Sequence, residues 1–128
     1  MASEKYYIIH LEDNPDITER MAILFEKEEK ISYEPVFSAT EAFESLEKAL
    51  PDLMLVDLMI EDDKNAVSGI DFIKKAKKLY PELKMIVLTN RGEQKYRYEL
   101  KDFVEDFEVK IFKPSVYKQK ILDFLYNH

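Results

Sequence analysis

The chain has 128 residues, of which 26 are acidic and 19 are basic, so its formal net charge is −7. A chain of this length is typical of one domain that buries enough apolar surface to fold without covalent staples, and we expect a single domain over residues 1–128. The negative charge opposes binding to a phosphate backbone, so we expect no direct nucleic-acid partner. The absence of cysteine excludes disulfides and thiolate metal sites.

The N-terminal sequence MASEKYYIIHL lacks the charged start and long apolar run of a secretory signal. No apolar stretch reaches the length that is needed to span a bilayer. We therefore expect a soluble, cytoplasmic protein without membrane insertion.

Five apolar segments are predicted to be strands. Most of them are continuously apolar, which is typical of strands that are covered on both faces in a parallel sheet. The second segment contains Pro35 and is predicted to be an edge strand. In chain order, the segments are 6–11, 33–37, 53–56, 85–88 and 109–112.

The stretches between these segments have the apolar spacing of helices. The first helix follows Asn14, a suitable N-cap, and Pro15, which suits a first turn. Pro51 and Pro81 are expected to end the second and third helices, and Ser115 to cap the fifth. The marker residues are, in chain order, Ile17, Met21, Leu24 and Phe25; Ala42, Phe43, Leu46 and Leu50; Ile70, Ile73, Ala76, Lys77 and Tyr80; Tyr96, Leu100, Phe103 and Val104; and Val116, Ile121, Leu122 and Leu125.

Five strands that alternate with five helices imply right-handed crossovers and helices on both faces of one sheet. We predict an α/β fold, a doubly wound (βα)5 three-layer sandwich around a five-stranded parallel sheet. In such a sheet, ligands bind beyond the carboxyl ends of the strands.

Charged and polar side chains follow four of the predicted strands: Glu12 and Asp13 the first, Asp57 the third, Thr89 the fourth and Lys113 the fifth. Two carboxylates about 4 Å apart repel by roughly 4 kcal/mol at an effective dielectric constant near 20, and one lysine cannot offset three of them. Oxygen ligands suit Mg²⁺. A carboxylate nucleophile, a divalent cation, a lysine and a hydroxyl are the groups that phosphoryl transfer uses.

With these residues in this order, the chain resembles the receiver domain of two-component response regulators. IIHLEDNP resembles the acidic pair of the family, and SATEAFESLEKALPDLMLVDLM resembles its second helix through the phosphoacceptor. MIVLTN carries the hydroxyl position, and IFKPS carries the Lys-Pro pair. The resemblance covers essentially the whole chain and implies the flavodoxin-like sheet order 2-1-3-4-5.

The resemblance also implies the chemistry. Asp57 would accept a phosphoryl group from a histidine kinase or a histidine phosphotransfer protein. Mg²⁺ would be bound by Glu12, Asp13, Asp57 and the backbone carbonyl of Met59. The resemblance further implies that the domain catalyses its own phosphotransfer and dephosphorylation.

By the same resemblance, Thr89 and Lys113 would contact the phosphoryl oxygens. A downstream protein partner would dock on the face formed by the fourth helix, fifth strand and fifth helix. With no output domain expected, the effect would come from protein–protein interaction, and homodimer formation stays open.

Three positions depart from the family pattern. Lys110 stands where the family has its switch aromatic, Asn90 replaces a smaller residue, and Glu61 replaces a proline at the start of an acidic loop, 61–68. The alternative is therefore a receiver-like binding scaffold that works without phosphorylation. A phosphatase of the haloacid-dehalogenase type would need an acid two residues after Asp57, where Met59 stands.

Overall fold

The computed structural model describes residues 5–58, 60, 69–89, 94–109 and 114–127. The predictions for Met59, the 61–68 loop, Asn90, Lys110 and Lys113 therefore lie outside the described residues.

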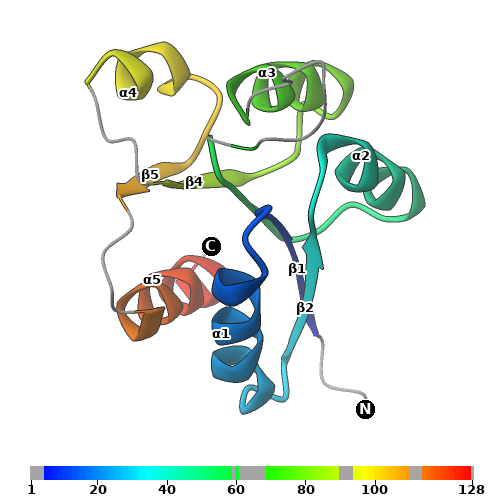
Figure 1. Cartoon of the computed structure of the whole chain (residues 1–128), viewed down its shortest axis with the longest axis vertical. Helices are drawn as coiled ribbons and strands as arrows, with labels where there is room; N and C mark the ends of the chain where they lie inside the picture. Colours follow the sequence, from blue (N-terminus) through cyan, green and yellow to red (C-terminus); the bar gives the residue numbers. More distant parts are fainter. Residues whose placement is uncertain (1–4, 59, 61–68, 90–93, 110–113, 128) are drawn as a thin grey trace.

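Five parallel strands form one sheet in the order β2-β1-β3-β4-β5, which confirms the predicted order (Figure 1). Strands and helices alternate along the described chain, as predicted. The elements are β1 (Tyr6–Leu11), α1 (Pro15–Glu26), β2 (Ile31–Val36), α2 (Ala39–Lys48), β3 (Leu53–Val56), α3 (Gly69–Leu79), β4 (Met85–Thr89), α4 (Gln94–Leu100), β5 (Asp106–Val109) and α5 (Pro114–Asn127).

The sheet is the middle of three layers, with α1 and α5 over one face and α2, α3 and α4 over the other (Figure 1). Successive side chains of a strand point to opposite faces, so each central strand supplies both cores. On β3, Leu53 and Leu55 pack towards α1 and α5, while Met54 and Val56 pack towards α2 and α3. All four are fully buried, which explains why the apolar run is continuous.

The helix caps agree in part with the prediction. The Asn14 side chain accepts a hydrogen bond from the N–H of Asp16 and caps α1, as predicted. Helix α2 ends at Lys48, so the prediction that Leu50 belongs to its apolar stripe is wrong, and Leu50 is exposed. Helix α5 begins at Pro114, so Ser115 lies within the helix rather than at its cap.

Strand β5 was predicted at 109–112, but the structure begins it at Asp106, and residues 110–112 lie outside the described part. The prediction missed the start because β5 is an edge strand that alternates polar and apolar residues instead of being apolar throughout. Asp106 and Glu108 lie on the side of α5, whereas Phe107 joins the core on the opposite face. At the other edge, β2 contains Pro35, as an edge strand permits.

None of the helices in the described part of the chain has the length and apolarity that crossing a bilayer requires.

Candidate functional site

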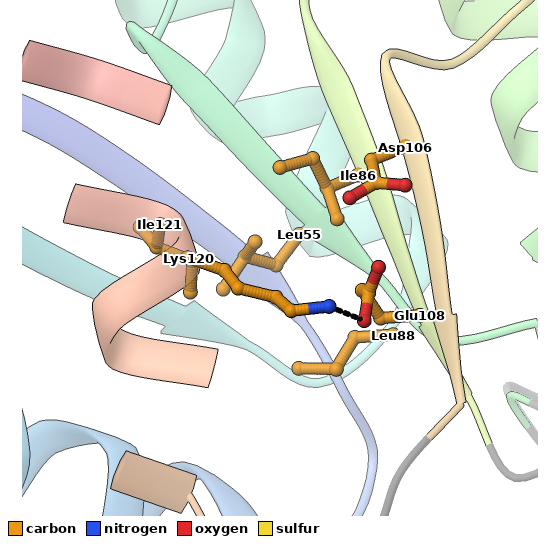
Figure 2. A pocket seen from close by; sticks show the side chains of 7 residues that line it. All are labelled: Leu55, Ile86, Leu88, Asp106, Glu108, Lys120 and Ile121. Carbon is orange, nitrogen blue, oxygen red and sulfur yellow. Dashed lines mark hydrogen bonds and ion pairs between the residues drawn. The ribbon is translucent and has the colours of Figure 1, made fainter. Parts of the chain in front are cut away.

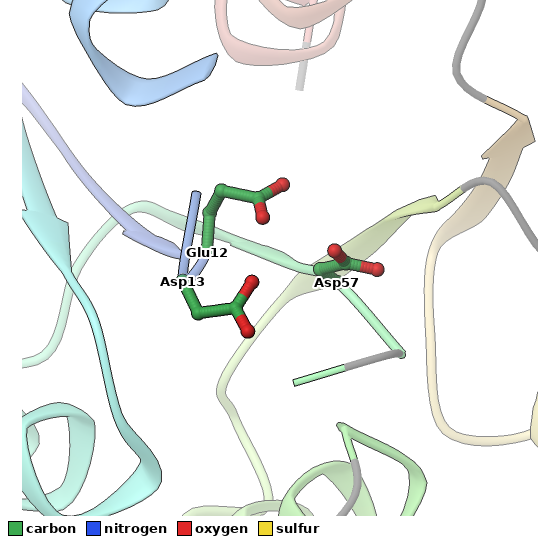
Figure 3. Close-up of side chains that lie close together, drawn as sticks. All are labelled: Glu12, Asp13 and Asp57. Carbon is green, nitrogen blue, oxygen red and sulfur yellow. The ribbon is translucent and has the colours of Figure 1, made fainter. Parts of the chain in front are cut away.

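Three carboxylates meet at the carboxyl ends of β1 and β3. Glu12 and Asp13 follow β1, Asp57 follows β3, and one carboxylate oxygen from each lies within 4.8 Å of the others (Figure 3). Glu12 and Asp57 are buried and Asp13 is half-buried. The predicted proximity of the three acids is therefore confirmed among the described residues.

Backbone hydrogen bonds hold Glu12 and Asp57 at the carboxyl-terminal edge of the sheet. The N–H of Asp57 donates to the carbonyl of Leu11 at 3.0 Å, and the N–H of Glu12 donates to the carbonyl of Val36 at 3.0 Å. These bonds extend the β1–β3 and β1–β2 pairing by one residue beyond the strands. Each acid is thus held at the carboxyl end of a strand. In a parallel sheet, side chains from distant parts of the sequence meet at these strand ends.

The first turn of α1 orients Glu12. Its carboxylate accepts a hydrogen bond of 3.2 Å from the N–H of Asn14, the residue that caps α1. A negative side chain at this place also interacts favourably with the amino-terminal end of the helix dipole. Asn14 therefore both starts the helix and holds the carboxylate beside it.

A second polar contact, which the sequence analysis did not anticipate, adjoins Glu12. The hydroxyl of Tyr33 lies 2.6 Å from Nδ1 of His10, a fully buried residue of β1. Burial first, and then the negative charge of Glu12, raise the pKa of Tyr33 above its usual range. The phenol is therefore neutral at physiological pH, and the His10–Tyr33 contact joins β1 to β2 behind the acidic cluster.

The acidic cluster fits a hard divalent cation. At an effective dielectric constant near 20, two carboxylate charges 4.8 Å apart repel by about 3 kcal/mol. Three carboxylates supply only oxygen ligands, which is the donor set that Mg²⁺ prefers. The residues present therefore fit Mg²⁺, and this cation would be held by Glu12, Asp13 and Asp57.

Thr89 lies at the same edge of the sheet. It is the last residue of β4, the strand that pairs with β3, and it is fully buried. The other two predicted site residues, Met59 and Lys113, lie outside the described residues, so their place relative to the three acids stays a prediction.

Two described cavities lie away from the acids. One of about 10 Å³ between the sheet and α5 has room for about one water molecule at most (Figure 2). Its lining consists of Leu55, Ile86, Leu88, Asp106, Glu108, Lys120 and Ile121. The other, an open groove of about 320 Å³ between α1 and β2, is lined mainly by apolar side chains such as Ile23 and Ile31. Neither cavity is lined by Glu12, Asp13 or Asp57.

The comparisons with known proteins agree with this geometry. Residues 8–122 match the model of the response regulator receiver domain family. The chemotaxis protein CheY of Thermotoga maritima is 36% identical over 90 residues, which cover 67% of this chain and 72% of CheY. The chain therefore belongs to the response regulator receiver domain family.

Solved structures share the fold. A CheY-like receiver domain protein from Methanospirillum hungatei is 23% identical with a TM-score of 0.84, covering 98% of this chain and 96% of that protein. The response regulator TrrA of Thermotoga maritima, solved with Mg²⁺-BeF, is 20% identical with a TM-score of 0.77, covering 92% and 97%. NtrX of Brucella abortus is 20% identical with a TM-score of 0.78, and the match covers 95% of this chain but only 28% of NtrX.

Proposed function

We propose that residues 1–128 form a phosphoacceptor receiver domain of a cytoplasmic two-component system, which takes a phosphoryl group onto Asp57 from a histidine kinase or a histidine phosphotransfer protein. The observation that carries this proposal is the acidic cluster at the ends of β1 and β3. Membership of the receiver family adds that such domains interact with kinases and downstream partners.

Asp57 is the proposed nucleophile because it directly follows the central strand β3, and only 5% of its surface is exposed. One of its carboxylate oxygens forms a bond to phosphorus as the bond from phosphorus to the imidazole nitrogen of the donor breaks. The electron pair of that bond stays on the nitrogen, which takes up a proton from water. Bound Mg²⁺ would supply the positive charge that offsets the carboxylates and the phosphoryl oxygens.

The other proposed roles are those of the Mg²⁺ ligands and of the groups that contact the phosphoryl oxygens. Glu12 and Asp13 would hold Mg²⁺ together with Asp57 and the carbonyl of Met59. Thr89 would donate its hydroxyl to a phosphoryl oxygen, and Lys113 would contact another. Thr89 is supported by its burial at the end of β4, while the roles of Met59 and Lys113 rest on the family pattern.

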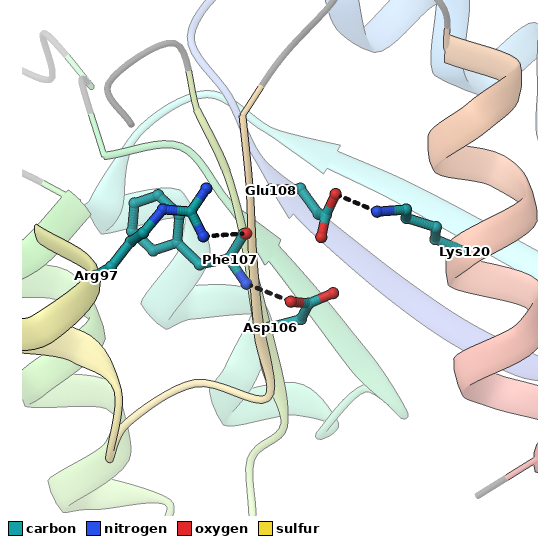
Figure 4. Close-up of polar contacts among 5 residues, drawn as sticks. All are labelled: Arg97, Asp106, Phe107, Glu108 and Lys120. Carbon is teal, nitrogen blue, oxygen red and sulfur yellow. Dashed lines mark hydrogen bonds and ion pairs between the residues drawn. The ribbon is translucent and has the colours of Figure 1, made fainter. Parts of the chain in front are cut away.

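The proposed docking surface for a downstream partner is the face formed by α4, β5 and α5. Arg97 fastens α4 to β5, because its Nη1 donates to the carbonyl of Phe107 at 3.3 Å and its guanidinium lies 4.8 Å from the Phe107 ring centre (Figure 4). Lys120 of α5 pairs with Glu108 of β5 (Figure 4). Tyr98 of α4 is 73% exposed, which offers an aromatic contact to a partner.

The direct test is incubation with acetyl phosphate and Mg²⁺, followed by intact-protein mass spectrometry. The wild-type protein is expected to gain the mass of one phosphoryl group, and Asp57→Asn is expected to gain none. Asp102→Asn is the matched control, because Asp102 is an exposed acid in the turn after α4 and should be phosphorylated as the wild type is.

Failure of the wild type to gain a phosphoryl group, or an equal gain by Asp57→Asn, would contradict the proposal. Absence of saturable Mg²⁺ binding would favour the alternative, a receiver-like scaffold that binds its partner without phosphorylation. Light scattering of the phosphorylated sample would show in the same experiment whether two copies associate.

A further inference from the structure

Gly69, the first residue of α3, lies against the backbone of Asp57 and Leu58. Its N–H donates to the carbonyl of Leu58 at 3.0 Å. A Cβ atom added to Gly69 would stand 2.1 Å from the carbonyl oxygen of Asp57, 2.6 Å from Cα of Leu58 and 2.9 Å from the carbonyl carbon of Asp57. Real Cβ atoms essentially never come within 3.0 Å of a heavy atom outside their own residue and its two chain neighbours. Residue 69 therefore has no space for any side chain.

The three obstructing atoms all belong to the main chain, so no side-chain rotation can remove the clash. A substitution must instead move either α3 or the end of β3. Helix α3 is anchored by Phe72, Ile73 and Ala76, all of which are fully buried in the core beneath it. Densely packed cores resist displacement of this kind, so α3 cannot withdraw without opening a cavity.

The end of β3 is more easily displaced than α3. The pairing of β3 with β1 and with β4 ends at Val56. Asp57 and Leu58 lie beyond this pairing, where the N–H of Asp57 still donates to the carbonyl of Leu11. A side chain on residue 69 would therefore displace the peptide that joins Asp57 to Leu58, and the carboxylate of Asp57 would move with it.

We propose that Gly69 is a positioning residue of the acidic site: its missing side chain lets α3 close onto the backbone of Asp57 and keep that carboxylate beside Glu12 and Asp13. This inference rests on the proposed function, because its consequence is measured as Mg²⁺ binding and phosphorylation. Gly69 is one of only two glycines in the chain, and here its role is to provide space.

The test compares Gly69→Ala with Ile73→Val, a control that removes one methylene group from the buried face of the same helix. Isothermal titration with Mg²⁺ is expected to show an affinity at least tenfold lower for Gly69→Ala. Its rate of phosphorylation by acetyl phosphate is expected to fall by about a hundredfold, the order of loss that a displacement of about 1 Å produces at a reacting group. The control is expected to stay within about twofold of the wild type, because a small apolar change mainly affects stability.

A second readout needs no metal. In ¹H–¹⁵N spectra recorded with EDTA, the amide signals of Asp57 and Leu58 are expected to shift in Gly69→Ala and to keep their wild-type positions in Ile73→Val. If the wild type fails to bind Mg²⁺, the proposed function falls, while these signals still decide whether Gly69 sets the backbone of Asp57.

Wild-type Mg²⁺ affinity in folded Gly69→Ala would overturn the inference, and so would unshifted Asp57 and Leu58 signals. If Gly69→Ala is unfolded in buffer, the measurements are repeated in trimethylamine N-oxide, which favours compact states. A variant that stays unfolded there would show that Gly69 is needed for folding as a whole, and this result would also overturn a positioning role.

Discussion

Two groups of acidic side chains lie on this sheet, and they are arranged differently. Glu12, Asp13 and Asp57 come from two strand ends that are distant in sequence, and their oxygens lie within 4.8 Å of one another. Asp106 and Glu108 are two residues apart on one edge strand. Asp106 accepts a hydrogen bond of 2.8 Å from the N–H of Phe107, and Glu108 pairs with Lys120 of α5 (Figure 4).

This difference in arrangement suits the two groups to different roles: the acids of β5 support the fold, and the acids at the ends of β1 and β3 support cation binding. On β5, each carboxylate has a partner of its own close by, which gives modest stability and leaves little capacity for a cation. At the ends of β1 and β3, three carboxylates share one small volume, which raises the energy of the metal-free protein and prepares a binding site for a cation. The two groups should therefore respond in opposite directions when they are neutralised.

The largest expected effect is on Mg²⁺ affinity. Asp57→Asn and Asp13→Asn are each expected to weaken Mg²⁺ binding by about a hundredfold or more, because loss of a ligand should cost at least as much as loss of a residue that only orients one. Isothermal titration of EDTA-treated protein measures the change. Glu108→Gln is the control and should keep wild-type affinity; an equal loss in that variant would remove the distinction between the two groups.

A smaller effect, of opposite sign, is expected on stability without metal. Asp57→Asn is expected to raise the free energy of unfolding by about 1–3 kcal/mol, because it removes one of three charges that repel one another. Urea denaturation in EDTA at low ionic strength measures this free energy. The gain should shrink when Mg²⁺ is added, since the wild type then recovers stability by binding the cation. A destabilised Asp57→Asn would mean that the charge of Asp57 supports the fold.

The smallest effect is expected on β5. Glu108→Gln is expected to lower the free energy of unfolding by less than about 1 kcal/mol, because the Glu108–Lys120 pair is partly exposed and such pairs are weak. The loss should diminish further at high salt, which screens exposed charges. The same urea titration at two salt concentrations measures both quantities. A loss that is large and independent of salt would show that Glu108 stabilises the fold mainly through packing rather than charge.

The central strands could be predicted from the sequence because burial on both faces leaves a plain signature. β1 and β3 have the predicted bounds, since their apolar runs end where the strands end. The start of β5 could not be predicted in this way, because its alternation of Asp106, Phe107 and Glu108 is the pattern of a strand with one polar face. Leu50 was assigned to α2 from its spacing alone, but the helix stops at Lys48.

The acidic cluster could also be predicted, because parallel strands bring their carboxyl ends to one edge of the sheet. Gly69 could not be. Nothing in its local sequence shows that the start of α3 touches the backbone of Asp57, and this contact exists only once the helix has packed onto the sheet. The contact between His10 and Tyr33 was missed for a similar reason, since it depends on the register of β1 against β2.

Pro35 in the edge strand β2 has a consequence for self-association. A proline has no N–H to offer, so a strand from another molecule that approached the outer side of β2 would meet an interrupted row of donors. Growth of the sheet from one copy into the next is thereby discouraged at the β2 edge. If two copies of this domain do pair, they should meet on a surface other than the outer side of β2, so that this edge of the sheet stays a boundary of the molecule.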